Sequence, residues 1–194
     1  MSQPKPQLAM RRASLEDLPE VALPPGYRIR SFRPGDEAHW ATIISESFGG
    51  PAGPQRFDMM KDDAAFRPER VLFVECEEGP VGTASAWSRV KQGKDAGYLH
   101  MVGVRPAHAG KRLGYWVSLA ALRQLAREGK RSALLHTDDF RLAAIKTYLR
   151  LGFEPLLVSE EQPGRWRAVF EQLGEPRFGE EFRAILEGPV RPPA

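Results

Sequence analysis

The order in which strand-like and helix-like segments follow one another is the feature that most constrains the fold of this chain. An alternating or continuous apolar pattern is typical of β-strands, and apolar residues at i, i+3 and i+4 are typical of helices. The predicted strands cover residues 27–32, 71–76, 81–90, 98–104, 132–136 and 153–158. Hairpin strands come first and a strand–helix–strand–helix unit follows, which predicts an α/β fold with a mixed sheet covered by helices.

Turn residues mark the ends of the predicted helices. Asp36 is placed to cap the first helix, and Asp138 or Asp139 to cap the fourth. Gly129 and Gly152 are expected to end the two long helices. The predicted helices cover residues 36–48, 55–66, 111–128, 138–151, 165–173 and 180–186, and residues 91–95 are expected to form a charged hairpin loop.

Proline-rich ends flank the patterned part of the chain. The first 25 residues carry five prolines and no strand or helix period, so residues 1–25 are predicted to form an arm. Residues 26–158 are expected to form one domain, with residues 159–194 adding helices and a tail that pack on it. A further strand after Val158 is not expected, because acidic residues, a proline and a glycine follow.

Composition excludes several classes of protein. With 194 residues, 42% hydrophobic and 27% charged, the chain is too apolar to be disordered, and its apolar stretches are too short to span a bilayer. No signal-peptide pattern follows Met1, so a soluble cytoplasmic protein is expected. The single Cys76 and four scattered histidines give no zinc-site spacing, so no metal is expected. A net charge of +3 favours a small anionic ligand over nucleic acid.

One strand–turn–helix joint carries the features of an anion site. The strand ends at Val104, and a basic turn then opens a long helix whose first N–H groups lack intrahelical partners. Gly110 and Gly114 remove Cβ atoms where a phosphate would approach, and Lys111 and Arg112 add positive charge. The joint therefore predicts a pyrophosphate-binding turn; glycines that only ease packing remain the alternative.

Two motifs in this order resemble the GCN5-related N-acetyltransferase (GNAT) superfamily. The family's acyl-CoA motif, Q/R-x-x-G-x-G/A, corresponds to residues 109–114, where Gly114 matches, Ala109 replaces Gln/Arg and Arg112 replaces the middle glycine. Because a left-handed conformation is strained for arginine, a helical one is expected at Arg112. The later motif, an Asn followed by A-x-x-x-Y-x-x-x-G-F, is matched by Ala144, Tyr148, Gly152 and Phe153, with Arg141 standing for the Asn.

This resemblance implies a GNAT-like mixed, mostly antiparallel central sheet of six to seven strands flanked by helices. It also implies that acetyl-CoA is the co-substrate, lying between strands 98–104 and 132–136, with an amine attacking it directly and no covalent enzyme intermediate. The residues implied to bind acetyl-CoA are Met101, Val102, Val104, Ala109, Gly110, Lys111, Arg112, Leu113, Gly114 and Arg141.

The same resemblance implies roles in proton transfer. Tyr148 matches the family's general acid, which returns a proton to the CoA thiolate; read alone, it is a core aromatic residue. His100 is the best candidate base, in a strand similar to that of arylalkylamine N-acetyltransferases, although Tyr98 replaces the second histidine of their proton relay. A hydrogen-bonded sheet histidine is the alternative for His100, and Glu75 is a rival base.

The sequence therefore predicts an acetyl-CoA-dependent N-acyltransferase that acetylates a primary amine of a small molecule or peptide. The alternative is a GNAT-fold acyl-CoA-binding or regulatory domain without turnover, which the altered 109–114 turn favours and Tyr148 opposes. Trp40, Phe48 and Trp87 either line an acceptor pocket or fill the core. A homodimer is compatible with the family, whereas nucleic acid and membrane are not expected as partners. The acceptor and the preferred acyl chain stay open.

Overall fold

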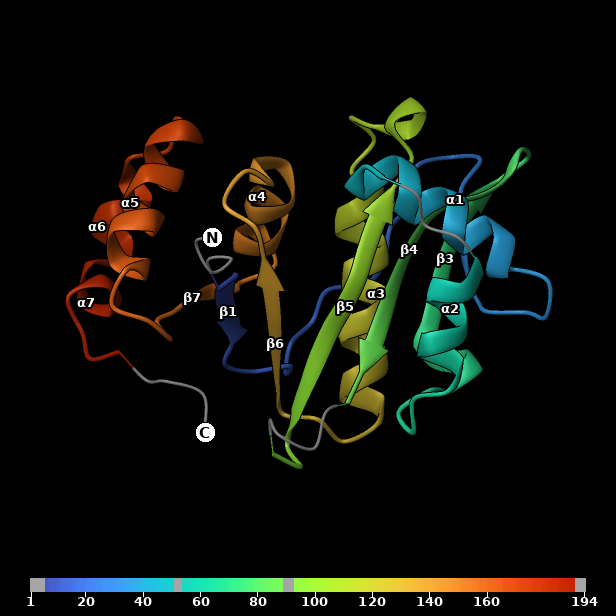
Figure 1. Cartoon of the computed structure of the whole chain (residues 1–194), viewed down its shortest axis with the longest axis horizontal. Helices are drawn as coiled ribbons and strands as arrows, with labels where there is room; N and C mark the ends of the chain where they lie inside the picture. The colour runs from blue at the N-terminus through green and yellow to red at the C-terminus, as the bar shows by residue number, and fades with distance from the viewer. Residues whose placement is uncertain (1–5, 51–53, 89–92, 191–194) are drawn as a thin grey trace. The chain divides into compact units, whose positions relative to one another are not determined.

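The computed structural model of the chain describes residues 6–50, 54–88 and 93–190 (Figure 1). The chain divides into two compact units, residues 14–133 and residues 1–13 with 134–194. The expected fold class is confirmed: the chain is a mixed α/β protein with a mostly antiparallel sheet flanked by helices, and the described residues include seven strands.

Four antiparallel strands form the sheet of the larger unit. In spatial order they are β2 (Arg28–Ser31), β3 (Val71–Cys76), β4 (Gly79–Trp87) and β5 (Ala96–Val104). Strands β3 and β4 are buried along almost their whole length, because helices cover both faces of this sheet. This explains why β3 opens with a continuous apolar run and why β4 consists mostly of small and apolar residues, without an alternation of apolar and charged ones.

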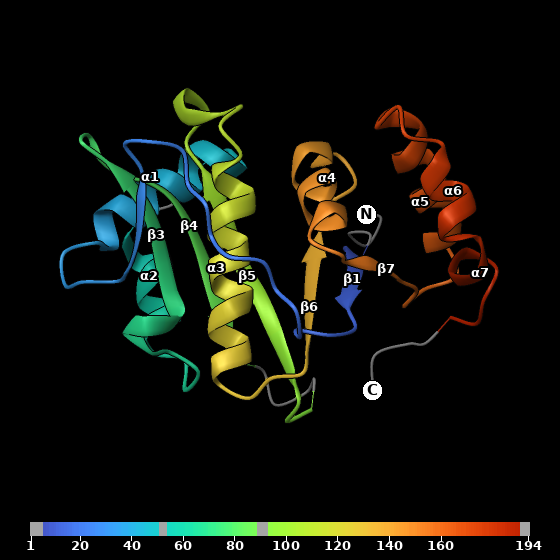
Figure 2. The same ribbon diagram turned by 180° about the vertical axis from the view of Figure 1, so that it is seen from behind.

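Helices α1 (Glu37–Phe48) and α2 (Pro54–Lys61) lie on one face of this sheet, and α3 (Leu113–Arg127) lies on the other (Figures 1 and 2). Two short 3₁₀ helices, η1 (Pro68–Arg70) and η3 (Pro106–His108), precede β3 and α3. Helix α1 buries Trp40, Ile43 and Ile44 at i, i+3 and i+4, as its sequence pattern predicts.

The smaller unit is built from segments near both ends of the chain. Its strands are β6 (Ser132–Thr137), which begins in the larger unit, then β1 (Leu8–Arg12) and β7 (Glu154–Leu156) in spatial order. Strands β1 and β7 pair antiparallel, with Ala9 opposite Leu156. The helices of this unit are α4 (Leu142–Arg150), α5 (Gln162–Gln172), α6 (Arg177–Glu181) and α7 (Arg183–Leu186).

The expectation that no strand forms in the first 25 residues is wrong. Strand β1 buries Leu8, Ala9 and Met10 almost completely, and the prolines flank it without interrupting it. Three apolar residues are too few to show a period, and the partner strand β7 lies far along the chain. No strand follows Val158 among residues 159–190, as expected, so the seventh strand comes from the N-terminus.

Two predicted caps do not form. Asp36 occupies the position before α1, but its carboxylate accepts hydrogen bonds from the Arg30 guanidinium and from the Arg33 backbone N–H instead of capping the helix. Helix α4 begins only at Leu142, and Asp139 pairs with Arg165. Part of the predicted 91–95 hairpin loop lies outside the described residues. None of the described helices has the length and apolarity to cross a bilayer.

Candidate active site

Strand β5 is distorted where the acyl-CoA-binding strand was predicted. In the pairing of β5 with β4, Gly103 lies opposite Thr83 and His100 lies opposite Ser85. Between these two pairs, β5 therefore has one residue more than β4. Met101 adopts a positive φ of 50°, a conformation that costs a non-glycine residue roughly 1–2 kcal/mol. A bulge of this kind interrupts the ladder and leaves Met101 and Val102 without a partner residue on β4.

The turn that follows β5 contains a second strained residue. The expectation of a helical conformation at Arg112 is wrong: Arg112 is the N-cap residue of α3 and is left-handed, with φ 57° and ψ 20°. Its guanidinium carbon lies 5.0 Å from the ring centroid of Tyr115 and 5.6 Å from that of Trp116. These cation–π contacts offset the backbone strain, and the left-handed geometry explains why glycine occupies this position in the motif that the turn resembles.

The N-terminus of α3 is open to an anion. Its first turn contains no acidic residue, and no side chain caps it, so its leading N–H groups lack acceptors within the helix. A Cβ added to Gly114 would lie 3.7 Å from a methyl group of Val104, an ordinary contact, so protein packing does not require glycine there. Gly110 and Gly114 therefore leave room for a ligand, and this geometry fits the pyrophosphate of acetyl-CoA.

A cavity of about 250 Å³ lies in the larger unit beside the bulge. Its walls come from α1, from α2 and the residues after it, and from strands β4 and β5. The lining residues are Trp40, Arg56, Met59, Met60, Asp63, Trp87, His100 and Met101. Trp40 and Trp87 both line the cavity and fill the core, since they are at most 2% exposed. Apolar walls with one guanidinium and one carboxylate suit a small amine with an apolar part.

His100 stands at the junction of this cavity and the bulge. Its ring is half-buried between two other rings, with the Trp87 centroid at 5.9 Å and the Tyr98 centroid at 5.5 Å. Because Met101 is next in the chain and lines the same cavity, a base at His100 would be adjacent to the strained backbone of the bulge.

Glu75, the rival base, is occupied in an ion-pair network. Its carboxylate accepts hydrogen bonds from Arg28 at 2.6 Å and from Arg30 at 2.5 Å, and it is only 5% exposed. Burial by itself raises the pKa of the Glu75 carboxyl, but the two guanidinium groups outweigh burial and hold the pKa below its ordinary value. A carboxylate stabilised in this way is a poor proton acceptor.

The predicted general acid belongs to the smaller unit. Tyr148 lies on α4 and is 6% exposed, with its ring 6.1 Å from the ring of Phe153, the other aromatic residue of the same motif. Arg141 occupies the position before α4 and is half-buried. His100 and residues 101–114 belong to the larger unit.

Sequence reasoning missed Arg56 and Asp63 as lining residues. Both lie in a stretch whose charged residues are otherwise unremarkable, and the sequence shows no signal that separates these two from their neighbours. Their convergence on Trp40 depends on how α2 and the residues after it pack against α1, which only the structure shows.

A bulged strand followed by an uncapped helix N-terminus, within a mixed sheet covered by helices, is the arrangement that the two sequence motifs led us to expect. The chain belongs to the acetyltransferase (GNAT) family, whose sequence model matches residues 38–153. The family resemblance expected from the two motifs is thereby confirmed.

Curated relatives include mycothiol acetyltransferases of actinobacteria. That of Streptomyces scabiei is 33% identical over 155 residues, which covers 76% of this chain and 50% of the relative. That of Streptomyces coelicolor is 32% identical over 143 residues, covering 71% and 46%. The chain thus spans about half the length of the curated relatives it matches.

Solved structures show the same fold. A GCN5-related N-acetyltransferase from Sphaerobacter thermophilus superposes with a TM-score of 0.62 at 24% identity, covering 78% of this chain and 49% of that one. The ribosomal-protein-S18-alanine N-acetyltransferase from Escherichia coli superposes with a TM-score of 0.54 at 19% identity, covering 65% and 76%.

Proposed function

We propose that this chain transfers an acetyl group from acetyl-CoA to a primary amine by direct attack, without a covalent enzyme intermediate. The observation that carries the proposal is the bulge at Met101 next to an amine-sized cavity and followed by an open helix N-terminus. Family membership supports the acetyl-transfer chemistry, and the bulge and turn support the mode of binding.

The binding roles follow from the backbone. The N–H groups of residues 109–114, backed by the α3 dipole, bind the pyrophosphate, and Lys111 and Arg112 add positive charge. The backbone of Met101, Val102 and Val104 pairs with the pantetheine arm. The bulge keeps Met101 and Val102 out of the β4 ladder, whereas Val104 pairs with Gly82 of β4 and is assigned by its place in the motif. A backbone N–H at the bulge donates to the acetyl oxygen as negative charge develops there. Arg141 is assigned to the cofactor by its place in the motif alone.

The proposed role of His100 in proton transfer follows from its place in the cavity wall, and that of Tyr148 follows from its place in the motif alone. The Asp63 carboxylate attracts the acceptor as an ammonium ion, and the His100 imidazole takes one proton from it. The amine nitrogen then forms a bond to the acetyl carbon and the carbon–sulfur bond breaks. Tyr148 donates its hydroxyl proton to the departing thiolate, and the second proton that leaves the amine nitrogen restores the Tyr148 hydroxyl through solvent. The ion pairs of Glu75 with Arg28 and Arg30 favour His100 over Glu75 as the base.

The acceptor is proposed to be a small amine. A cavity of about 250 Å³ with apolar walls holds a small molecule or one terminal residue of a peptide. The curated relatives are named mycothiol acetyltransferases, which favours the first of these. A cytoplasmic location and a homodimer remain predictions.

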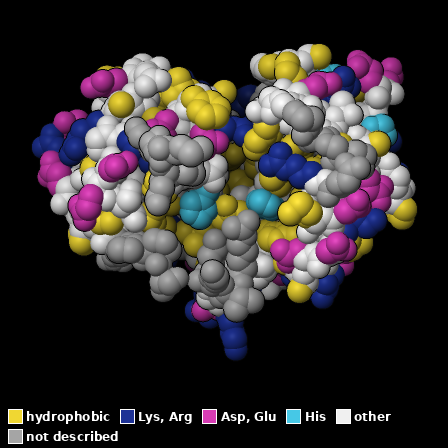
Figure 3. Space-filling model, viewed as in Figure 1, with side chains coloured by type: hydrophobic (Ala, Val, Ile, Leu, Met, Phe, Trp, Pro, Cys, Tyr) yellow, Lys and Arg dark blue, Asp and Glu magenta, His cyan; other side chains and the backbone are white. Residues whose placement is uncertain are grey.

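The face seen in Figure 3 gives no support for binding to nucleic acid. Basic and acidic side chains are interspersed over the face seen in Figure 3, whereas a nucleic-acid-binding face gathers Lys and Arg into a patch or stripe.

Acetyl-CoA binding measured by calorimetry tests the proposal first. Gly114→Trp should lower acetyl-CoA affinity at least about 100-fold, because the indole fills the space where the pyrophosphate would lie. Gly164→Trp is the matched control, because Gly164 also lies in the first turn of a helix. Nothing lies within 4 Å of its missing Cβ, so this variant should bind acetyl-CoA normally.

Two results would contradict the proposal. No binding by the wild type at millimolar acetyl-CoA would mean that Ala109 and Arg112 have disabled the turn. Tight binding without turnover on a panel of amines, including the acceptor of the mycothiol acetyltransferases, would support the acyl-CoA-binding or regulatory domain instead.

A further inference from the structure

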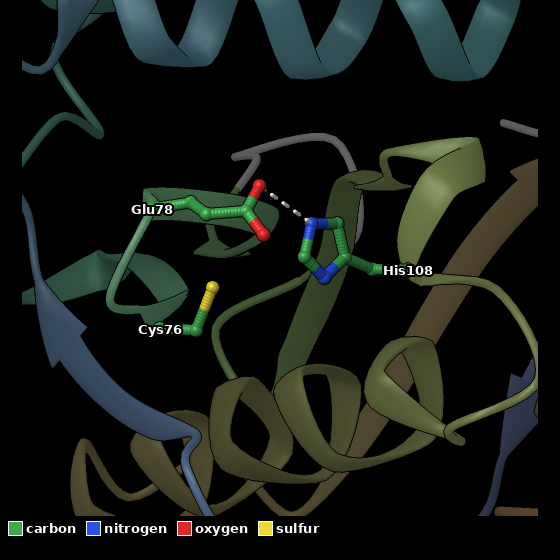
Figure 4. A group of neighbouring side chains, drawn as sticks. All are labelled: Cys76, Glu78 and His108. Carbon is green, nitrogen blue, oxygen red and sulfur yellow. Dashed lines mark ion pairs between the residues drawn. The ribbon is translucent and has the colours of Figure 1, made fainter.

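Three side chains that the proposed acetyl transfer does not use converge in the larger unit. Cys76 is the last residue of β3, Glu78 lies in the turn between β3 and β4, and His108 is the last residue of η3 (Figure 4). The Cys76 sulfur, a Glu78 carboxylate oxygen and an imidazole nitrogen of His108 all lie within 4.8 Å of one another. Each of these is a ligand atom that divalent transition metals accept.

The imidazole of His108 is already oriented toward the other two groups. His108 is 5% exposed, and its Nδ1 is hydrogen-bonded to the hydroxyl of Tyr27 at 3.0 Å. Its Nε2 faces Glu78, whose carboxylate oxygen is 3.6 Å away, a separation longer than a hydrogen bond. Metal-ligating histidines hold their second nitrogen in such an outer-shell contact, which fixes the ring and the tautomer.

We propose that Cys76 Sγ, the Glu78 carboxylate and His108 Nε2 bind Zn²⁺, with water as the fourth ligand. Thiolate, imidazole and carboxylate are the ligands that zinc takes in tetrahedral sites, whereas Mg²⁺ and Ca²⁺ require oxygen ligands. Ligand atoms around tetrahedral zinc are roughly 3.3–3.6 Å apart, so the group needs only a small contraction. Glu78 can supply its own part of this contraction, because its side chain is 70% exposed and can move.

The charges balance at this site. The ligand is the thiolate, so zinc binding releases the thiol proton of Cys76 to solvent, and the thiolate and carboxylate together neutralise the metal ion. The neighbouring guanidinium of Arg105 is paired with Glu46 at 3.0 Å, which lessens its repulsion of a cation. Lys111 Nζ lies over the Tyr27 ring, 5.6 Å from its centroid.

The site would fix the segment that leads into the proposed pyrophosphate turn. His108 directly precedes Ala109, and Cys76 and Glu78 flank the β3–β4 turn. Zinc would therefore tie these two segments together. The sequence predicts no metal, because metal sites are recognised in a sequence by short spacings between ligands. Cys76 and His108 are far apart in the sequence and are brought together only by the fold.

Cobalt substitution tests the site directly on tag-free, chelator-treated, reduced protein without acetyl-CoA or amine. Co²⁺ should bind one to one and give a thiolate-to-cobalt charge-transfer band with the visible bands of a tetrahedral ion, and Zn²⁺ should displace it. Cys76→Ser should remove the charge-transfer band, and Tyr27→Phe should weaken Zn²⁺ binding about 10-fold by freeing the imidazole. Mg²⁺ should not compete.

Two adjacent carboxylates of the β3–β4 turn provide a test variant and its matched control. Glu78→Gln, at an exposed position that cannot disturb the core, should weaken Zn²⁺ binding more than Tyr27→Phe does, whereas Glu77→Gln should leave it unchanged. A charge-transfer band that survives Cys76→Ser, or equal effects of the two glutamine variants, would overturn the proposal. Because no step requires acetyl-CoA, failure of this test leaves the proposed acetyl transfer standing.

Discussion

Three described non-glycine residues of the larger unit have a positive φ, namely Asp17, Met101 and Arg112, and the last two lie where the co-substrate is proposed to bind. Met101 forms the β5 bulge, and Arg112 begins α3. Strained residues persist only where the surrounding structure fixes them, and they cluster at functional sites. At Arg112 the fixing contacts are visible as the rings of Tyr115 and Trp116.

Replacing Arg112 separates backbone strain from side-chain contacts. Arg112→Gly removes both the strain and the ring contacts, so its stability should stay within about 1 kcal/mol of the wild type. Arg112→Ala keeps the strain and loses the contacts, so it should be about 1 kcal/mol less stable than Arg112→Gly. Urea denaturation measures both differences. Equal stabilities of the two variants would show that Arg112 is not left-handed in solution.

The hydroxyl of Tyr148 is the group expected to protonate the leaving thiolate. Tyr148→Phe should lower kcat about 100-fold and leave acetyl-CoA affinity nearly unchanged, because general acid catalysis is lost while the ring stays packed near Phe153. Tyr115→Phe is the control, since it also loses one phenol hydroxyl and keeps the ring beneath Arg112. An unchanged kcat for Tyr148→Phe would remove this residue from the chemistry.

At the scale of elements, one ion-pair network joins β2, β3 and the start of α1. Arg30 is 13% exposed in its side chain and binds both Asp36 and Glu75, at distances of 2.5–2.9 Å. Burial raises the pKa of the Asp36 carboxyl, but hydrogen bonds from Arg30 and from the Arg33 N–H outweigh burial and lower it, and Glu75 is lowered in the same way. The network therefore makes these elements sensitive to acid.

Because both folded-state pKa values are depressed, the unfolded chain binds more protons than the folded chain in acid. The stabilisation is full above the ordinary pKa values of 3.8 for Asp36 and 4.5 for Glu75, and it is lost as pH falls below them. Arg30→Met should cost about 3–5 kcal/mol at pH 7, since it leaves a buried carboxylate without its cation, and less at pH 3. Urea denaturation across this range measures the loss. Arg33→Met is the control, because Arg33 is an exposed neighbour; it should lower the free energy of unfolding little at either pH. A loss of unfolding free energy for Arg30→Met that does not depend on pH would contradict the network.

At the scale of the whole molecule, the N-terminal strand belongs with the C-terminal segments. Met10 is fully buried in β1, so Met10→Ala should cost about 2–5 kcal/mol of unfolding free energy. Arg11→Ala, on the exposed side of the same strand, should cost no more than about 0.5 kcal/mol. Thermal or denaturant unfolding measures both. Equal small effects would support the arm predicted from the prolines.

Much of the fold could be predicted from the sequence because its signals are local. The apolar patterns of β3, α3 and α4 extend over enough residues to reveal their periods, and the 109–114 turn shows its basic and glycine residues in order. The missed features depend on distant partners. Strand β1 forms by pairing with β7, and the proposed acceptor cavity forms where α1 packs against the residues after α2. The positive φ at Met101 belongs to a bulge that the residue type does not predict.

The pairing of β1 with β7 sets an order of events during synthesis. Ala9 leaves the ribosome well before Leu156, its partner, and at 5–20 residues per second the delay is roughly 7–30 s. Until β6, its other neighbour in the sheet, is made, the apolar run Leu8–Met10 has no strand to join, and closing so long a loop slows folding further. The prolines and charged residues around this run therefore have a use of their own, because they hinder edge-to-edge association of nascent chains until β6 and β7 arrive.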